Sequence, residues 1–287
     1  MRTLGRKKEF AMDSDFRTRR GRLRGFSINR LIPNVLTLAA LCAGLTAIRY
    51  GLQGQMERAV IAIMVAAVLD ALDGRVARRL GVTSRFGAEL DSLSDFLCFG
   101  VTPALILYMS SLTDSGALGW IVTLMFPMCS ALRLARFNTA LVSDTPPPAW
   151  TGSYFTGVPA PAGALLALIP LMVSFALGEA WPHHPIIVGV VLVAVGGLMV
   201  SRLPTFSFKK GRVPRHLVLP ALLGAALVMG VIASSPWIGL SLFGLVYVSL
   251  IPFSWMSYQR QARQDSGGAG AAVVNLRAVD AGSPPRE

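Results

Sequence analysis

Long apolar stretches restrict this chain to folds that a lipid bilayer can hold. Hydrophobic residues make up 53% of the 287 residues and charged residues only 15%, whereas about 25% of a soluble domain is charged. Eight stretches approach the length that spans a bilayer, at 31–52, 59–74, 90–109, 118–138, 159–177, 185–201, 217–234 and 237–255. The sequence therefore predicts an all-α polytopic membrane protein with about eight transmembrane helices.

The positions of lysine and arginine orient these helices, because short cytoplasmic loops carry the excess of positive charge. With the N-terminus inside, only Arg49 and Arg58 fall on the outer side, and the other basic residues fall in inner segments. We therefore expect a basic cytoplasmic N-terminal segment at 1–30, a transmembrane domain at 31–258, and a disordered cytoplasmic tail at 259–287.

The net charge of +12 raises the question of nucleic-acid binding, since basic chains are typical of such proteins. Here topology and anionic lipid headgroups account for the charge, so no nucleic-acid partner is expected. The segment 17–30, which reads RTRRGRLRGFSINR, directly precedes the first span. It either lies on the anionic membrane surface, as juxtamembrane basic clusters do, or serves only as a topological anchor.

Four aspartates lie where apolar stretches end or begin, in the run DALDGRVARRLGVTSRFGAELDSLSD. They are Asp70, Asp73, Asp91 and Asp95. A charged side chain at membrane depth costs roughly 2.5–3.5 kcal/mol even on the translocon insertion scale. Four such side chains therefore require partners or bound metal ions.

The spacing places the four carboxylates on two facing stripes. At 100° per residue, Asp70 and Asp73 share one helix face that extends to Arg78. In the next helix Gly87, Asp91 and Asp95 recur at intervals of four and form a second stripe. A turn around residues 81–84 can bring the two faces together, provided that the helix at 59–74 continues through Arg78 or beyond.

Clustered carboxylates repel one another and take up protons unless cations neutralise them. Oxygen ligands with no histidine or cysteine nearby favour hard divalent ions, so Mg²⁺ or Mn²⁺ is expected in preference to Zn²⁺ or Ca²⁺. Four aspartates can hold two ions about 3.5–4 Å apart, the separation found in two-metal phosphoryl-transfer sites.

Small residues beside the carboxylates leave two interpretations open. Gly74, Ala77 and Gly87 leave room for a large substrate against the helix backbone, or they serve helix packing, as small residues do at membrane interfaces. Arg78 on the same face either binds a phosphate or extends to the membrane surface.

The complete pattern resembles the signature of the CDP-alcohol phosphatidyltransferase family. Its eight fixed residues are all present, in the order Asp70-x2-Asp73-Gly74-x2-Ala77-Arg78-x8-Gly87-x3-Asp91-x3-Asp95. Pro33-Asn34 with Thr37 also resembles the family's opening segment. The resemblance implies a catalytic domain with a six-helix core plus two further helices.

Two further segments resemble the bacterial integral-membrane members of the family that use L-serine as the acceptor. These are RLARFN at 133–138 and FTGVPAPA at 155–162. The resemblance implies that the phosphatidyl group passes from CDP-diacylglycerol to L-serine, which gives phosphatidylserine and CMP. It also implies a homodimer in the bacterial cytoplasmic (inner) membrane, and the positions of lysine and arginine predict that the active site faces the cytoplasm.

The resemblance also implies a role for each residue of the signature. Asp70, Asp73 and Asp91 are metal ligands, and Asp95 is both a ligand of the second ion and the general base. The residues that line the CDP site are Gly74, Ala77, Arg78 and Gly87. A base of this kind is required because a serine hydroxyl is a poor nucleophile until its proton is removed.

Serine also needs a partner for its carboxylate. Arg133 and Arg136 present forked guanidinium groups about one helical turn apart, and Asn138 belongs to the same run. These residues either bind serine or the lipid phosphate, or the two arginines are only topological charges.

Two other functions remain compatible with the sequence. The same chemistry can serve glycerol 3-phosphate or inositol phosphate as the acceptor. A cation transporter could also use the aspartates as an ion pathway, although the cluster is expected at one interface and no second copy of it occurs.

Overall fold

The computed structural model describes residues 31–82, 84–142, 154–201, 204–206, 218–254 and 256. Its helices are α2 (Leu31–Leu52), α3 (Met56–Leu80), α4 (Arg85–Asp95), α5 (Thr102–Leu107), α6 (Gly116–Val142), α7 (Ala160–Ala167), α8 (Ile169–Leu177), α9 (Pro185–Val200), α10 (Val218–Ser234) and a last helix, Pro236–Ser254. The π-helical turns Phe96–Val101 and Tyr108–Leu112 flank α5, and the short 3₁₀ turns Thr113–Ser115 and Trp181–His183 precede α6 and α9. The segments expected at 1–30 and 259–287 lie outside the described residues.

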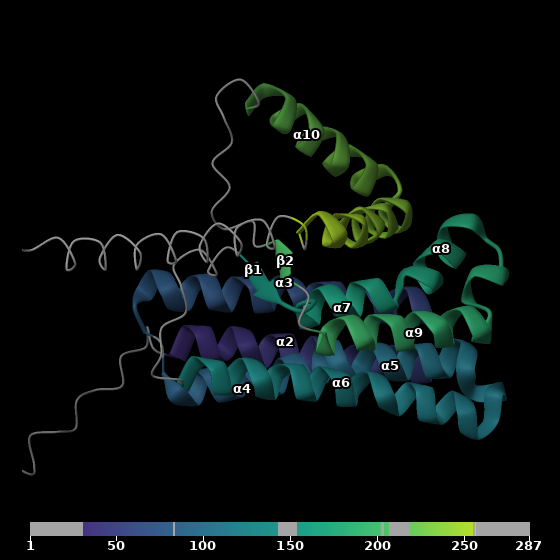
Figure 1. Ribbon diagram of the computed structural model, residues 1–287, viewed down its shortest axis with the longest axis horizontal. Coiled ribbons are helices and arrows are strands. Elements are labelled where there is room, and N and C mark those ends of the chain that lie inside the picture. The colour runs from purple at the N-terminus through teal and green to yellow at the C-terminus, as the bar shows by residue number, and fades with distance from the viewer. Residues whose placement is uncertain are drawn as a thin grey trace, which may run out of the picture.

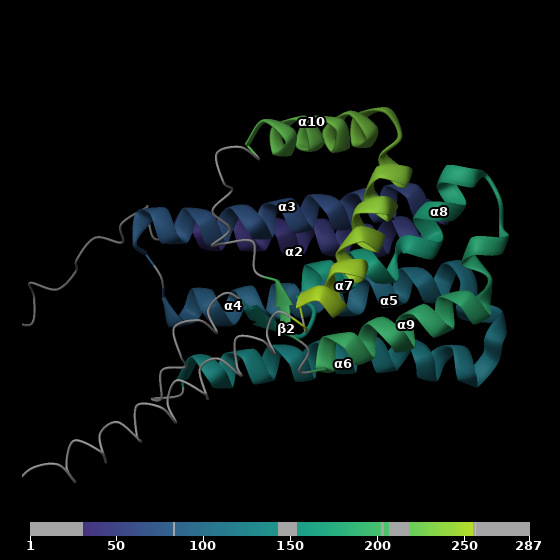
Figure 2. The ribbon, with the colours of Figure 1, turned by 45° about the horizontal axis from the view of Figure 1, so that its top comes forward.

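Most helices run side by side along the long axis of the molecule (Figure 1). α2 and α3 form an antiparallel pair, and α6 runs back along the helical segment that contains α4 and α5. α9 packs on α6 and α7. In both views α10 lies apart from this bundle, while the last helix crosses it (Figure 2). The all-α prediction is therefore confirmed, apart from one short ribbon described below.

A seam of small residues explains how closely α2 and α3 pack. The buried residues of α2 recur at alternating steps of four and three and are Pro33, Thr37, Ala40, Gly44, Ala47 and Gly51. Half of those of α3 are alanines, at Ala59, Ala62 and Ala66; the others are Val60, Ile63 and, at the end of the series, Asp73. Small side chains let helix backbones approach closely in a membrane. The seam thus places the first turns of α2 against the end of α3.

Large apolar side chains lie on the outer face of the same two helices. They are Val35, Leu38, Leu45 and Leu52 of α2, and Ile61, Val65, Val68 and Leu72 of α3, each at least 40% exposed. A soluble protein rarely exposes an apolar surface of this extent. This inside-out distribution indicates an integral membrane protein.

Fewer helices qualify as spans by length and composition than the sequence predicted. Among the described residues, three helical runs qualify: Leu31–Leu52, Arg85–Thr139 and Pro236–Ser254. The pair α7 and α8, bent by 41°, makes a fourth if it crosses as one span. α3 carries two aspartates and three arginines in its C-terminal half, and α9 and α10 have only 16 and 17 residues. Eight helical segments are present near the expected positions, and the prediction that all eight cross the membrane is not confirmed among the described residues.

One element was not expected. β1 (Tyr154–Thr156) pairs antiparallel with β2 (Pro204–Phe206) in a two-stranded ribbon. The ribbon joins the segment before α7 to the segment after α9. It therefore ties together two connections that are far apart in the sequence.

Candidate metal centre and substrate pocket

Three aspartates from two helices meet at the site. One carboxylate oxygen from each of Asp70 on α3, and Asp91 and Asp95 on α4, lies within 4.8 Å of the other two. The turn expected at 81–84 makes this possible. Gly81 ends α3 in the left-handed conformation, at φ 62°, and the Ser84 hydroxyl caps α4 by accepting a hydrogen bond of 3.0 Å from the Gly87 amide.

Asp95 is the most enclosed member of this group. Its Oδ1 atom is buried and has no hydrogen-bond partner among the described residues. The π-helical turn Phe96–Val101 begins at the next residue, and such turns inside helices are frequent at functional sites. A buried carboxylate oxygen without a partner is costly, so its ligand or proton has to come from outside these residues.

Asp73 lies outside this close group of three but interacts electrostatically with Asp70 and Asp91. Its side chain is buried, and its Oδ2 accepts a hydrogen bond of 2.6 Å from the Thr37 hydroxyl on α2. The sequence predicted that all four carboxylates converge. Three of them form the close group, and Asp73 interacts electrostatically with two of these from its position beside α2. The small-residue seam between α2 and α3 produces the contact between Thr37 and Asp73.

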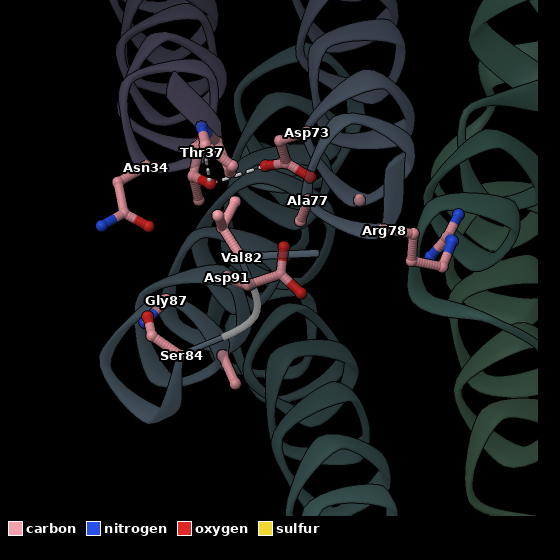
Figure 3. Close-up of a pocket in the computed structure, with 12 residues that line it drawn as sticks. Asn34, Thr37, Asp73, Ala77, Arg78, Val82, Ser84, Gly87 and Asp91 are labelled. Carbon is pink, nitrogen blue, oxygen red and sulfur yellow. Dashed lines mark hydrogen bonds between the residues drawn. The ribbon is translucent and has the colours of Figure 1, made fainter. Parts of the chain in front are cut away.

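A cavity of about 190 Å³ opens next to the carboxylates. All four residues expected at the CDP site line it, and so do Asp73 and Asp91; the full lining is Pro33, Asn34, Thr37, Asp73, Gly74, Ala77, Arg78, Val82, Ser84, Gly87, Ala88 and Asp91. In Figure 3 the two aspartates lie between Asn34 on one side and Arg78 on the other. Asp91 therefore belongs both to the carboxylate group and to the cavity wall.

The small residues of the signature keep this cavity open. A Cβ atom on Gly87 would lie 3.0 Å from Asn34 Oδ1 and 3.1 Å from Ser84 Oγ. A Cβ atom on Gly74 would lie 3.4 Å from the Arg78 guanidinium. Among the described residues, neither glycine is pressed against a neighbouring helix backbone, which favours the substrate-room interpretation over helix packing.

Arg133 on α6 is a charged residue that interacts with the carboxylate group. Its guanidinium interacts electrostatically with the Asp95 carboxylate and with Tyr247 of the last helix. The Nε atom is buried and has no hydrogen-bond partner among the described residues. The side chain is therefore available to an anionic ligand beside Asp95.

The other two residues of the RLARFN run make protein contacts. Asn138 donates a hydrogen bond of 3.0 Å to the Ser92 hydroxyl, which belongs to the helix of Asp91 and Asp95. Arg136 donates to the backbone carbonyls of Val200 and Ser201 at 2.8 and 3.1 Å. The structure thus separates the three residues that the sequence placed together.

The three-carboxylate group suits a divalent metal ion. It offers only oxygen donors, the kind that hard ions such as Mg²⁺ and Mn²⁺ prefer. Its members lie close enough for one ion to reach all three. The Oδ1 atom of Asp95, which has no hydrogen-bond partner among the described residues, is a further oxygen that can bind the ion.

Sequence reasoning did not assign roles to Thr37, Asn34 and Tyr247. Thr37 and Asn34 belong to the segment that resembles the family's opening. Their polar side chains at the start of an otherwise apolar helix were the signal that could have identified them. Tyr247 lies in the last helix, more than 100 residues from Arg133 along the chain, and nothing in the sequence connects the two.

The fold and the site define a membrane protein with a carboxylate-lined substrate pocket, and comparison with known proteins identifies its family. Residues 30–203 match the family model described as CDP-alcohol phosphatidyltransferase, and residues 216–252 match a second, CDP-alcohol phosphatidyltransferase 2. The chain belongs to the CDP-alcohol phosphatidyltransferase family.

Similar curated proteins are named CDP-diacylglycerol–serine O-phosphatidyltransferase. The chain is 36% identical to the one from Mycobacterium leprae over 241 residues, which covers 82% of this chain and 80% of the relative. It is 39% identical to the Mycobacterium tuberculosis protein over 235 residues, covering 82% and 81%. A Helicobacter pylori relative is 32% identical over 219 residues, covering 75% and 90%.

Proposed function

We propose that this protein transfers the phosphatidyl group from CDP-diacylglycerol to L-serine, which yields phosphatidylserine and CMP. The observation that carries the proposal is the three-carboxylate group of Asp70, Asp91 and Asp95 beside a cavity lined by the rest of the family signature. The names of the relatives support serine as the acceptor.

The cavity between α2, α3 and α4 receives the CDP part of the lipid substrate. Gly74, Ala77 and Gly87 give the nucleotide access to the helix backbones, while the Arg78 guanidinium pairs with a phosphate, a favourable charge-assisted contact. The diacylglycerol chains remain in the bilayer beside the large apolar side chains of the outer face.

Asp95 acts as the general base. The serine hydroxyl loses its proton to the Asp95 carboxylate as its oxygen forms a bond to the phosphorus that carries the diacylglycerol. The bond from that phosphorus to the CMP oxygen breaks, and CMP leaves with both electrons of the bond.

Asp70, Asp91 and Asp95 hold divalent ions, with Asp73 contributing from its place beside Thr37. A divalent ion bound there, Mg²⁺ or Mn²⁺, supplies Lewis-acid stabilisation of negative charge on the phosphate oxygens. The pair of ions expected from four aspartates follows from the same residues. Whether one ion or two are bound, the Thr37 hydroxyl orients the Asp73 carboxylate.

The enzyme lies in the bacterial cytoplasmic membrane with both termini and the site on the cytoplasmic side, where soluble serine and CMP have access. Residues 31–258 form the catalytic domain, with the basic segment 1–30 on the anionic lipid surface and the tail at 259–287. The functional unit is a homodimer. Support comes from the distribution of basic residues and from the family resemblance.

The direct test is CMP release from CDP-diacylglycerol by the full chain, purified in detergent, with serine and with Mg²⁺ or Mn²⁺. Removal of a general base lowers rates by about 10²–10⁴-fold, so the activity of Asp95→Asn is expected to fall by at least about 10²-fold. Asp114→Asn, at an exposed aspartate in the turn before α6, is the matched control. Full activity in folded Asp95→Asn, or in wild type with EDTA present, contradicts the proposal.

A further inference from the structure

The guanidinium of Arg136 closes the end of a neighbouring helix. It donates to the carbonyls of Val200 and Ser201, which belong to the last residue of α9 and the residue after it. The final carbonyls of a helix lack partners within the helix and carry partial negative charge. The planar, positively charged guanidinium of arginine can donate hydrogen bonds to two of these carbonyls at once.

A glycine turn packs against the same helix end. Gly157 adopts φ 78°, and a Cβ atom there would lie 2.6 Å from the Met199 carbonyl oxygen, 2.9 Å from that of Ser201 and 3.3 Å from Arg136 Nη2. Only glycine combines this backbone conformation with this close approach. The RLARFN and FTGVPAPA runs of the sequence therefore meet at one junction, the end of α9.

The end of α6 is fixed on two sides. Asn138 joins it to α4 through Ser92, and Arg136 joins it to α9. Arg133 lies about one helical turn before Arg136. Its guanidinium interacts electrostatically with Asp95, and its Nε atom is buried and has no hydrogen-bond partner among the described residues. The two arginines therefore have different partners. Arg136 donates to backbone carbonyls, whereas Arg133 interacts with a carboxylate of the site.

We propose that Arg136 is a positioning residue, which holds the end of α6 on α9 so that Arg133 binds the carboxylate of the acceptor beside Asp95. This inference rests on the proposed function, since it names the residue that recognises serine. The two arginines therefore have different roles. Arg133 binds the acceptor, and Arg136 acts through Arg133.

A double-mutant cycle on the serine KM tests this division, in the full-length protein purified in detergent. Arg133→Lys keeps the charge but loses the fork, so the serine KM is expected to rise about tenfold, the loss typical of one charge-assisted hydrogen bond. Arg136→Lys is expected to raise it about threefold or more, by displacing Arg133. If Arg136 acts through Arg133, the double variant has the KM of Arg133→Lys to within about twofold, because coupled residues are not additive.

Gly157→Ala disturbs the same junction without changing a charge and is expected to raise the serine KM as Arg136→Lys does. Arg49→Lys, at an exposed arginine in the last turn of α2, is the control and keeps the wild-type KM. The proposal is overturned if the two arginine effects multiply, if Arg136→Lys keeps the wild-type KM, or if it lowers only thermal stability. If the wild type uses another acceptor, the cycle is run with that acceptor, so failure of the serine assignment is recognised separately.

Discussion

The Thr37 hydroxyl of α2 donates a hydrogen bond of 2.6 Å to Asp73 Oδ2 of α3. The two residues stand at one end of the small-residue seam, where both side chains are buried. The hydrogen bond orients the one signature aspartate that lies outside the close group of three. Helix packing and the chemistry of the site are thereby linked in a single contact.

Thr37→Val removes this hydroxyl with little change of shape. Loss of a residue that orients a ligand typically costs about 10–100-fold in metal affinity, so the Mg²⁺ or Mn²⁺ concentration for half-maximal activity is expected to rise by at least about tenfold. Thr37→Ser keeps the donor and is expected to behave nearly as wild type. An unchanged metal requirement in Thr37→Val would show that the contact serves packing alone.

Asp91 and Asp70 are expected to differ when each is changed to asparagine. Asp91 belongs to the carboxylate group and also lines the cavity, whereas Asp70 belongs to the group and is absent from the cavity lining. Asp91→Asn should therefore raise both the metal requirement and the KM for CDP-diacylglycerol, and Asp70→Asn mainly the metal requirement. Steady-state kinetics at saturating metal separates the two effects, and identical profiles for both variants would refute the distinction.

Gly44 allows α2 to approach closely the π-helical turn Phe96–Val101, which directly follows Asp95. A Cβ atom there would lie 2.5 Å from Cys98 Sγ, and overpacking of this kind costs about 1–3 kcal/mol. Gly44→Ala is expected to lower the melting temperature in detergent, and Cys98→Ala should restore part of the loss by removing the sulfur. Gly189→Ala, on α9 with no atom within 4 Å of the added Cβ, is the control. An equal melting temperature for the two glycine variants contradicts the packing described.

Two loops should lie on opposite sides of the membrane. In a background with Cys42, Cys98 and Cys129 replaced, Ser84→Cys before α4 is expected to react with an impermeant maleimide only from the cytoplasmic side. Gly54→Cys, between α2 and α3, is expected to react only from the outside. Labelling of intact cells and of inverted vesicles gives the comparison, and the reverse pattern would overturn the predicted orientation.

The sequence was sufficient for the features that depend on local spacing. The helices, the turn at Gly81–Ser84 and the meeting of Asp70, Asp91 and Asp95 follow from helical periodicity and a short connection. The hydrogen bond between Thr37 and Asp73 depends on packing between α2 and α3, and a helical wheel of α3 alone cannot show it. The number of spans stays a prediction, because α3 carries charges in its C-terminal half and α9 and α10 have only 16 and 17 residues.

Features that join distant parts of the chain could not be predicted. The Arg136 contacts cross 64 and 65 residues to reach α9, and the neighbourhood of Arg133 includes Tyr247 from the last helix. The family resemblance identified Arg133, Arg136 and Asn138 as polar residues of one segment, RLARFN. Only their partners in the fold distinguish the residue that faces the site from the two that bind neighbouring helices.

The central claim is that this family member uses L-serine. The measurement is lipid product and CMP formed by the purified full chain from CDP-diacylglycerol, with serine, glycerol 3-phosphate, inositol phosphate or no acceptor in separate reactions. Phosphatidylserine and CMP in equal amounts with serine, and neither above background with the other acceptors, is the predicted result. Product formed only with an acceptor other than serine contradicts the account.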